Sequence, residues 1–199
     1  MSKKNVAVFV SGAGTNLQSI IDAGIEAANI AVVLSNKPDA YALERALNHA
    51  IPVEVVDHKE FDTREAFEAE LIERLKKYNI DLIVLAGFMR ILTSYFVSNY
   101  RQKIINLHPA LLPSFPGMHS AKQAIEYGVK FTGVTVHFVD DGVDTGPIIL
   151  QSVVPVEDND TEDTLLEKIH AEEHRVFPEA VRLFCEDRLS VSGRSVSIK

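Results

Sequence analysis

Asn106 and His108 are the two residues of this sequence whose types and spacing point most directly to chemistry. They end the stretch Ile-Ile-Asn-Leu-His at residues 104–108. Because side chains alternate along a strand, Asn106 and His108 would share one face. An amide can hold an oxyanion and an imidazole can move a proton, which is what acyl transfer requires. A capping Asn and a satisfied core His explain the pair equally well when it is taken alone.

Residues 140–147 form an acidic loop with the sequence Asp-Asp-Gly-Val-Asp-Thr-Gly-Pro. Clustered acids with glycines suggest calcium binding, but an EF-hand needs more alternating acids and a distant Glu. A carboxylate held in a fixed loop, such as that of Asp144, could instead orient His108. A plain hairpin turn is the alternative reading of this stretch.

Residues 12–16, Gly-Ala-Gly-Thr-Asn, follow an apolar run and precede an amphipathic pattern. Glycines at a strand-to-helix turn let backbone amides approach an anion, and the helix dipole favours negative charge there. A dinucleotide site would need a third glycine where Leu17 stands, and an acid where Ser35 and Asn36 stand. A Walker loop is absent. The pattern therefore favours a phosphate monoester, with a tight turn as the alternative.

Glu173 interrupts the apolar stripe of a long helix predicted over residues 161–184. The stripe consists of Leu166, Ile169, Val176, Phe177 and Ala180. A carboxylate on an apolar stripe is costly unless it meets a partner or a ligand. His170 and His174 have the spacing of zinc ligands, but Ala171 replaces the glutamate of a zinc-protease helix. We therefore expect no metal site here.

The elements that must position these residues fall into two halves of one predicted domain, residues 1–199. In residues 1–102, apolar strands alternate with helices, which predicts a Rossmann-like, doubly wound, mostly parallel α/β sheet. The expected strands are 5–11, 31–35, 53–56 and 81–86, and a fifth strand, 104–108, follows directly after this half. The expected helices begin near residue 16 and cover 40–49, 62–78, with Asp62 and Glu65 as a capping box, and 93–99.

Residues 103–199 change pattern and predict a smaller α+β half. A Pro-rich loop leads to a helix near 121–127 and then to strands 131–139 and 148–154. A short polar loop joins these strands, which indicates an antiparallel pair. The long helix follows, and residues 188–198 suggest a hairpin around Gly193.

Composition limits the classes of function. The net charge of −8 argues against a sequence-independent nucleic-acid binder, which needs a basic face. Charged residues occur along the whole sequence, so we expect no membrane span. The first apolar run is too short for the core of a signal peptide. The single cysteine, Cys185, permits no intrachain disulfide and fits a reducing, cytoplasmic compartment.

Four stretches together resemble the folate-dependent phosphoribosylglycinamide formyltransferase family. They are residues 11–16 (SGAGTN), 86–92 (AGFMRIL), 106–117 (NLHPALLPSFPG) and 133–146 (GVTVHFVDDGVDTG). The last two are shared with methionyl-tRNA formyltransferase and formyltetrahydrofolate deformylase, so they indicate formyl transfer without fixing the acceptor. The glycine loop at 12–16 resembles the family's acceptor phosphate loop and is the discriminating stretch.

The resemblance implies transfer of the formyl group of 10-formyltetrahydrofolate to the amine of phosphoribosylglycinamide in purine biosynthesis. It implies that Asn106, His108 and Asp144 are catalytic. Acceptor contacts would come from Gly14, Thr15, Asn16, His170 and Glu173. The folate would be lined by Arg64, Met89, Arg90, Ile91, Leu92, Asn106, Asp140, Asp141, Gly142, Val143 and Asp144.

The resemblance also implies small-molecule substrates, no metal, no nucleic acid and no membrane, and it leaves a homodimer open. We expect a cis peptide at Leu112-Pro113, because the Pro-rich loop must turn sharply beside the site. Alternatives that remain at this point are a formyltetrahydrofolate hydrolase, another folate-dependent formyltransferase, and a non-catalytic phosphosugar-binding module.

Overall fold

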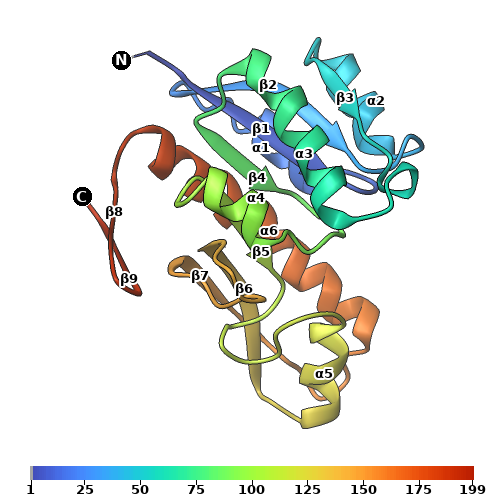
Figure 1. The fold of residues 1–199 in the computed structure, drawn as a ribbon. Coiled ribbons are helices and arrows are strands. Elements are labelled where there is room, and N and C mark those ends of the chain that lie inside the picture. The colour runs from blue at the N-terminus through green and yellow to red at the C-terminus, as the bar shows by residue number, and fades with distance from the viewer. Residues whose placement is uncertain (1) are drawn as a thin grey trace. The chain divides into compact units, whose positions relative to one another are not determined.

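Figure 1 shows the computed structural model of the chain, which describes residues 2–199. The chain divides into two compact units, the first ending at Ile105 and the second beginning at Asn106. The strands of the larger sheet follow the order β3-β2-β1-β4-β5-β6-β7. The division of roles between residues 1–102 and 103–199 stays a prediction.

The first unit contains a parallel sheet, as the alternating pattern predicted. Its strands are β1 (Lys4–Val10), β2 (Ala28–Ser35), β3 (Val53–Val55) and β4 (Leu82–Leu85). β1 pairs in parallel with both β2 and β4, and β2 pairs in parallel with β3. All five residues from Val6 to Val10 have no exposed surface. This continuous apolar run is typical of a parallel strand that is covered on both faces.

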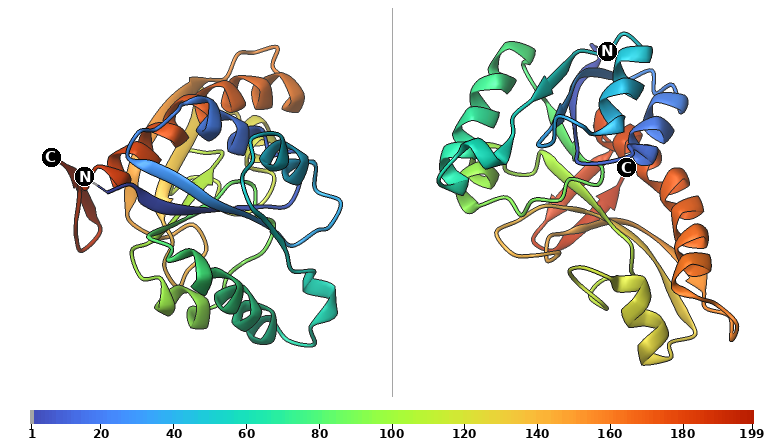
Figure 2. Two further views of the ribbon diagram at one scale, coloured as in Figure 1. Left: turned by 90° about the horizontal axis from the view of Figure 1, so that it is seen from above. Right: turned by 90° about the vertical axis from the view of Figure 1, so that its right-hand side faces the viewer.

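Helices cover both faces of this sheet. They are α1 (Thr15–Asp22), α2 (Tyr41–Asn48), α3 (Arg64–Leu75) and α4 (Ser94–Asn99), with short 3₁₀ turns at His58–Glu60 and Lys76–Tyr78. α1 and α2 lie on one face, and α3 and α4 on the other (Figure 2). The predicted start of α3 at Asp62 was wrong. Thr63 is the N-cap, and its hydroxyl accepts the Ala66 N–H at 3.1 Å.

β5 (Ile104–His108) has the predicted bounds and carries the chain from the first unit into the second. The second unit contains α5 (Ser120–Tyr127), β6 (Phe131–Phe138) and β7 (Ile148–Pro155). β6 and β7 are antiparallel, as predicted. The hairpin at the C-terminus is confirmed as β8 (Leu189–Ser192) and β9 (Ser195–Ile198).

α6 (Glu162–Cys185) packs against β6 and β7 in the second unit. Its first turn is closed by a capping box between Thr161 and Thr164. The buried stripe begins at Leu165, which has no exposed surface, and not at Leu166 as predicted. Although α6 has 24 residues, none of the helices in residues 2–199 is both long and apolar enough to span a membrane.

Candidate active site

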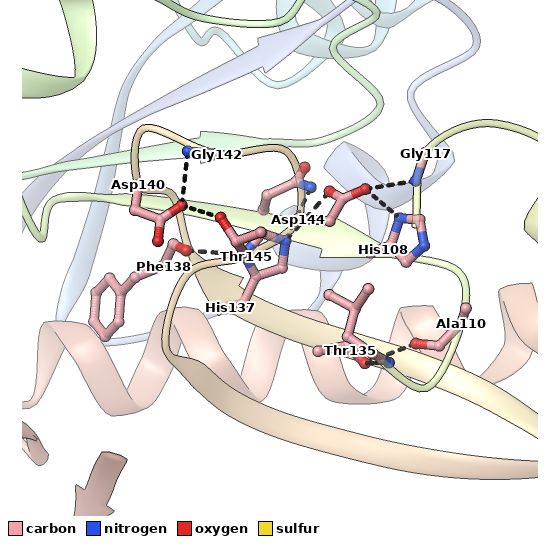
Figure 3. A network of polar contacts seen from close by, with 12 residues as sticks. His108, Ala110, Gly117, Thr135, His137, Phe138, Asp140, Gly142, Asp144 and Thr145 are labelled. Carbon is pink, nitrogen blue, oxygen red and sulfur yellow. Dashed lines mark hydrogen bonds and ion pairs between the residues drawn. The ribbon is translucent and has the colours of Figure 1, made fainter. Parts of the chain in front are cut away.

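The end of β5 and the loop after β6 bring His108 and Asp144 together in the second unit (Figure 3). The distance from His108 Nδ1 to Asp144 Oδ2 is 3.3 Å, and the two side chains are only 5% and 11% exposed. The strand fixes the imidazole, and the loop delivers the carboxylate to it. The expectation that Asp144 would orient His108 therefore agrees with the geometry.

The second nitrogen of His108 also faces an acceptor. Its Nε2 atom lies 2.8 Å from the carbonyl oxygen of Phe115, in the Pro-rich loop. A ring protonated on both nitrogens can donate to this carbonyl and to Asp144 together, whereas a neutral ring can donate to only one of them. The Pro-rich loop and the loop after β6 therefore fix the orientation of the His108 ring from two sides.

Asp144 is held as an anion by its surroundings. Burial by itself raises the pKa of this carboxyl, but the nearby imidazoles of His137 and His108 and the Gly117 N–H, which donates at 2.9 Å, bring the pKa below its ordinary value. The residue has a positive φ of 55°. Asp tolerates this region better than most residues, and strained backbone of this kind clusters at functional sites.

His137 is a buried residue of this site that the sequence reasoning missed. Its Nε2 atom lies 3.3 Å from Asn106 Nδ2 and 3.7 Å from Asp144 Oδ1, while Nδ1 lies 2.8 Å from the Phe138 carbonyl (Figure 3). The imidazole therefore links two of the predicted catalytic side chains. The sequence did contain a signal for it: His137 is a polar residue in a mostly apolar strand, and it lies on the same strand face as Thr135, two residues earlier.

Thr135, which the sequence reasoning also missed, holds the start of the Pro-rich loop through hydrogen bonds to its backbone. Its hydroxyl donates to the Ala110 carbonyl at 2.7 Å and accepts the Leu112 N–H at 3.0 Å. Gln151 donates to the Leu112 carbonyl, again at 3.0 Å. The predicted cis peptide at Leu112-Pro113 is confirmed. This buried network fixes the start of the loop that supplies Phe115 and Gly117.

The acidic loop is shaped by Asp140. Its Oδ1 atom accepts the Gly142 N–H at 3.1 Å and the Thr145 hydroxyl at 2.6 Å, which closes a turn (Figure 3). Asp141, Gly142 and Val143 are exposed at its tip. No group of three or more His, Cys, Asp or Glu side chains suited to a metal ion occurs in residues 2–199.

The predicted phosphate loop lies in the first unit, at the start of α1. Gly14 is the N-cap, with a positive φ of 73°, and an added Cβ would overlap Ala42. The first turn of α1 has no acidic residue, and Gly14 provides no side-chain cap. Backbone amides at the start of a helix favour an anion. Arg45, which the sequence reasoning missed, braces the loop by donating to the Ala13 carbonyl at 2.8 Å.

The predicted folate segment also lies in the first unit. Arg64, on α3, donates a hydrogen bond to the Ile91 carbonyl. The side chains of Met89 and Ile91 are 66% and 62% exposed, and those of Arg90 and Leu92 are half-buried. Exposed apolar groups on a braced segment are suited to contact with a flat, partly apolar ligand.

Comparison with known proteins identifies the family. A family model described as formyl transferase matches residues 4–181. The chain belongs to the formyl transferase family. This formyl transferase is 48% identical to glycinamide ribonucleotide transformylase 1 from Symbiobacterium toebii, with a TM-score of 0.96 and coverage of 98% of this chain and 94% of that one.

Two curated relatives differ in how much of them the formyl transferase spans. It is 44% identical to phosphoribosylglycinamide formyltransferase of Escherichia coli over 94% of this chain and 90% of that protein. It is 48% identical to the trifunctional purine biosynthetic protein adenosine-3 of Drosophila melanogaster over 96% of this chain. The chain spans only 14% of the length of that trifunctional relative.

The structure of this formyl transferase brings one predicted group of site residues into direct contact. His108 and Asp144 meet directly, and His137 contacts both Asn106 and Asp144. On α6, Glu173 is only 4% exposed, as its place on the stripe predicted, whereas His170 is exposed. Thr15 and Asn16 open α1. The shared roles of residues from different units remain predictions.

Proposed function

We propose that this formyl transferase moves the formyl group of 10-formyltetrahydrofolate to the amine of phosphoribosylglycinamide in purine biosynthesis. The observation that carries the proposal is the buried pair of His108 and Asp144, with Asn106 linked to it through His137. Identity of 44% along most of the Escherichia coli enzyme supports the choice of acceptor.

Each substrate is assigned to residues by its chemistry. Gly14, Thr15 and Asn16 would hold the acceptor phosphate, because backbone amides and a helix dipole favour a phosphate monoester. His170 and Glu173 of α6 would contact the rest of the acceptor. The donor folate would be lined by Arg64, residues 89–92 and residues 140–144.

The proposed reaction is direct transfer. The neutral amine of the acceptor attacks the formyl carbon, so a nitrogen–carbon bond forms and a tetrahedral oxyanion develops. The amide of Asn106 and the imidazole of His108 stabilise that oxyanion. The bond between the formyl carbon and N10 of the folate then breaks, and the electron pair returns to N10, which takes up a proton as the amine loses one.

Asp144 has two tasks in this scheme. It keeps the His108 ring in place, because its carboxylate faces Nδ1 at 3.3 Å. The lowered pKa keeps Asp144 an anion, so its carboxylate can also assist the movement of the proton that leaves the attacking amine. Phe115 occupies Nε2, so the edge of the ring beside Asp144 is the one that would face the reacting carbon.

Small-molecule substrates and a cytoplasmic location complete the proposal. The net charge of −8 and the single cysteine support both, since the first disfavours nucleic acid and the second suits a reducing compartment. A homodimer is left open, and light scattering of the purified chain at several concentrations would settle the oligomeric state.

One assay tests the activity. The purified chain is given 10-formyltetrahydrofolate with and without phosphoribosylglycinamide, and the release of tetrahydrofolate is followed by absorbance. We expect release that depends on the acceptor and is matched by formylated product. Release at the same rate without the acceptor would identify a hydrolase, and no release in either reaction would leave only a binding protein.

A further inference from the structure

Glu68 is a buried carboxylate that the proposed mechanism does not use. It lies on α3 with 1% of its surface exposed, and no salt bridge reaches it within residues 2–199. Its two oxygens instead accept hydrogen bonds from a single residue, Thr93, whose N–H donates at 2.7 Å and whose hydroxyl also donates. A buried carboxylate without a cationic partner destabilises a fold, so this contact calls for a reason beyond packing.

Thr93 is at an N-cap position but does not cap its helix in the usual way. It is the N-cap of α4, where a Thr hydroxyl ordinarily accepts an N–H of the first turn. In this helix no side-chain cap is formed, because the hydroxyl is turned toward Glu68. Local preferences given up in this way are expected at functional sites.

The contact between Thr93 and Glu68 is the last of three that hold the segment of residues 89–93, which precedes α4. The Met89 N–H donates to the Ser11 hydroxyl at 2.8 Å, the Ile91 carbonyl accepts from Arg64, and Thr93 is held by Glu68. These three contacts hold every second residue of the segment, at Met89, Ile91 and Thr93.

The segment between the anchors is left open to a ligand. Within residues 2–199, the backbone groups of Arg90 and Leu92 make no hydrogen bond. Arg64 and Glu68 stand four residues apart on α3, so they reach the segment from one helix face. Ser11 in turn is fixed by the buried Asn36, to whose amide oxygen it donates at 2.5 Å.

We propose that Glu68 is a positioning residue for the folate donor and acts through Thr93. It fixes the end of the 89–93 segment, so that the backbone and side chains of residues 89–92 are held ready for the donor. The acceptor phosphate loop is anchored separately, by Arg45. This inference rests on the proposed function, in which residues 89–92 line the folate.

A matched set of variants tests the role. Thr93→Ala removes the hydroxyl donor and Thr93→Ser keeps it, while Glu68→Met removes the carboxylate and keeps its volume. Glu65→Gln, on the exposed first turn of α3, is the control for a lost charge. Tetrahydrofolate binding is titrated by calorimetry, KM is measured for both substrates, and Tm is recorded for each variant.

We expect Glu68→Met and Thr93→Ala to weaken tetrahydrofolate binding by about tenfold or more, the loss typical of a charge-assisted hydrogen bond. Thr93→Ser and Glu65→Gln should bind as the unaltered chain does, and KM for phosphoribosylglycinamide should not change in any variant. The Tm of Glu68→Met should change little, because the relief of burying a carboxylate without a cationic partner offsets the loss of its two hydrogen bonds with Thr93.

Several results would overturn the role. The role is contradicted if Glu68→Met binds folate as the unaltered chain does, or if it loses equal affinity for both substrates. It is also contradicted if Thr93→Ser and Thr93→Ala bind folate equally. Folate binding by the unaltered chain distinguishes failure of the proposed function from failure of the positioning role of Glu68. If it binds no tetrahydrofolate, the proposed function fails, and this inference fails with it. If it binds folate and the variants bind equally well, only the positioning role is lost.

Discussion

His108 is held from both ring nitrogens, and this sets what it can do. The Phe115 carbonyl lies 2.8 Å from Nε2 and the Asp144 carboxylate lies 3.3 Å from Nδ1, so two separate loops fix the orientation of the ring. A ring held in this way is fixed in advance beside the position where the oxyanion would develop, and such preorganisation is a main source of transition-state stabilisation.

Removal of either partner should therefore reduce kcat strongly. We expect His108→Ala and Asp144→Asn each to lower kcat by about 10²–10⁴-fold, the range for general acid–base assistance, with little change in acceptor affinity. The double variant should lose less than the sum, because the two residues act as a unit. Steady-state kinetics of the three variants checks this. Fully additive losses would show that Asp144 does not work through His108.

The lowered pKa of Asp144 predicts a pH-dependent contribution to stability. Because the unfolded state has the ordinary value of 3.8 and the folded value is lower, the unfolded chain takes up the proton first as the pH falls. The stabilisation is complete above the unfolded value and is lost as the pH drops through the folded one. Urea unfolding of the unaltered chain and of Asp144→Asn should therefore differ most near neutral pH and converge below about pH 4. A constant difference down to low pH would contradict the assignment.

At the scale of elements, the strands were predictable because buried parallel strands read as continuous apolar runs. β5 matches its predicted bounds, since Pro109 ends the run directly after His108. The start of α3 was misplaced by one residue because Asp62 and Thr63 are both good N-caps, and only the fold decides between them.

The contacts of the site were less predictable than its strands. His137 lies one residue before the end of β6, and nothing in the local sequence indicates that the loop after this strand will bring Asp144 back to it. Thr135 reads as an ordinary strand residue, and its role depends on the path of the Pro-rich loop. Glu68 likewise gives no signal on α3, because Thr93 is distant in sequence. Contacts between distant segments are set by tertiary structure, which periodicity does not encode.

The turn into α1 offers a matched test of two glycines. Gly14 and Gly24, at opposite ends of the helix, both have positive φ, but an added Cβ meets Ala42 at Gly14 and open space at Gly24. Gly24→Ala should lower the free energy of unfolding by about 1–2 kcal/mol from backbone strain alone. Gly14→Ala should lower it further and also weaken acceptor binding. Urea unfolding and acceptor titration measure both effects, and equal losses of stability would contradict the close approach of Ala42.

Helix α6 supplies a second matched pair. Glu173 is buried on its apolar stripe, while Glu172 is partly exposed and accepts hydrogen bonds from Ser152 and Arg175. Glu173→Gln should weaken acceptor binding by roughly 10–150-fold, the value of a charge-assisted hydrogen bond, and should leave folate binding unchanged. Glu172→Gln makes the same charge change and should affect neither. Calorimetric titration decides, and an equal effect of the two variants would remove Glu173 from the acceptor site.

The charge of the whole molecule opposes both of its proposed substrates. The chain carries a net charge of −8, and a phosphorylated acceptor and a folate are both anions. Attraction must therefore be local. In the predicted phosphate loop it would come from backbone amides and the dipole of α1, since Nε and Nη1 of Arg45 already donate to the Ala13 carbonyl and to Gln18.

Long-range repulsion by the net charge, combined with local attraction by backbone amides, predicts an unusual salt dependence for acceptor binding. When the salt concentration rises from about 0.01 M to about 0.1 M, the Debye length falls from about 30 Å to about 10 Å. Repulsion by the net charge acts over the longer range and is screened, whereas hydrogen bonds from amides at contact distance are screened far less. The Kd for phosphoribosylglycinamide should therefore stay level or fall, by less than about tenfold. Calorimetry in sodium chloride, without sulfate because it competes for phosphate sites, measures the trend. A Kd that rises steeply with salt would mean that lysine or arginine side chains, and not the backbone of the loop, hold the phosphate.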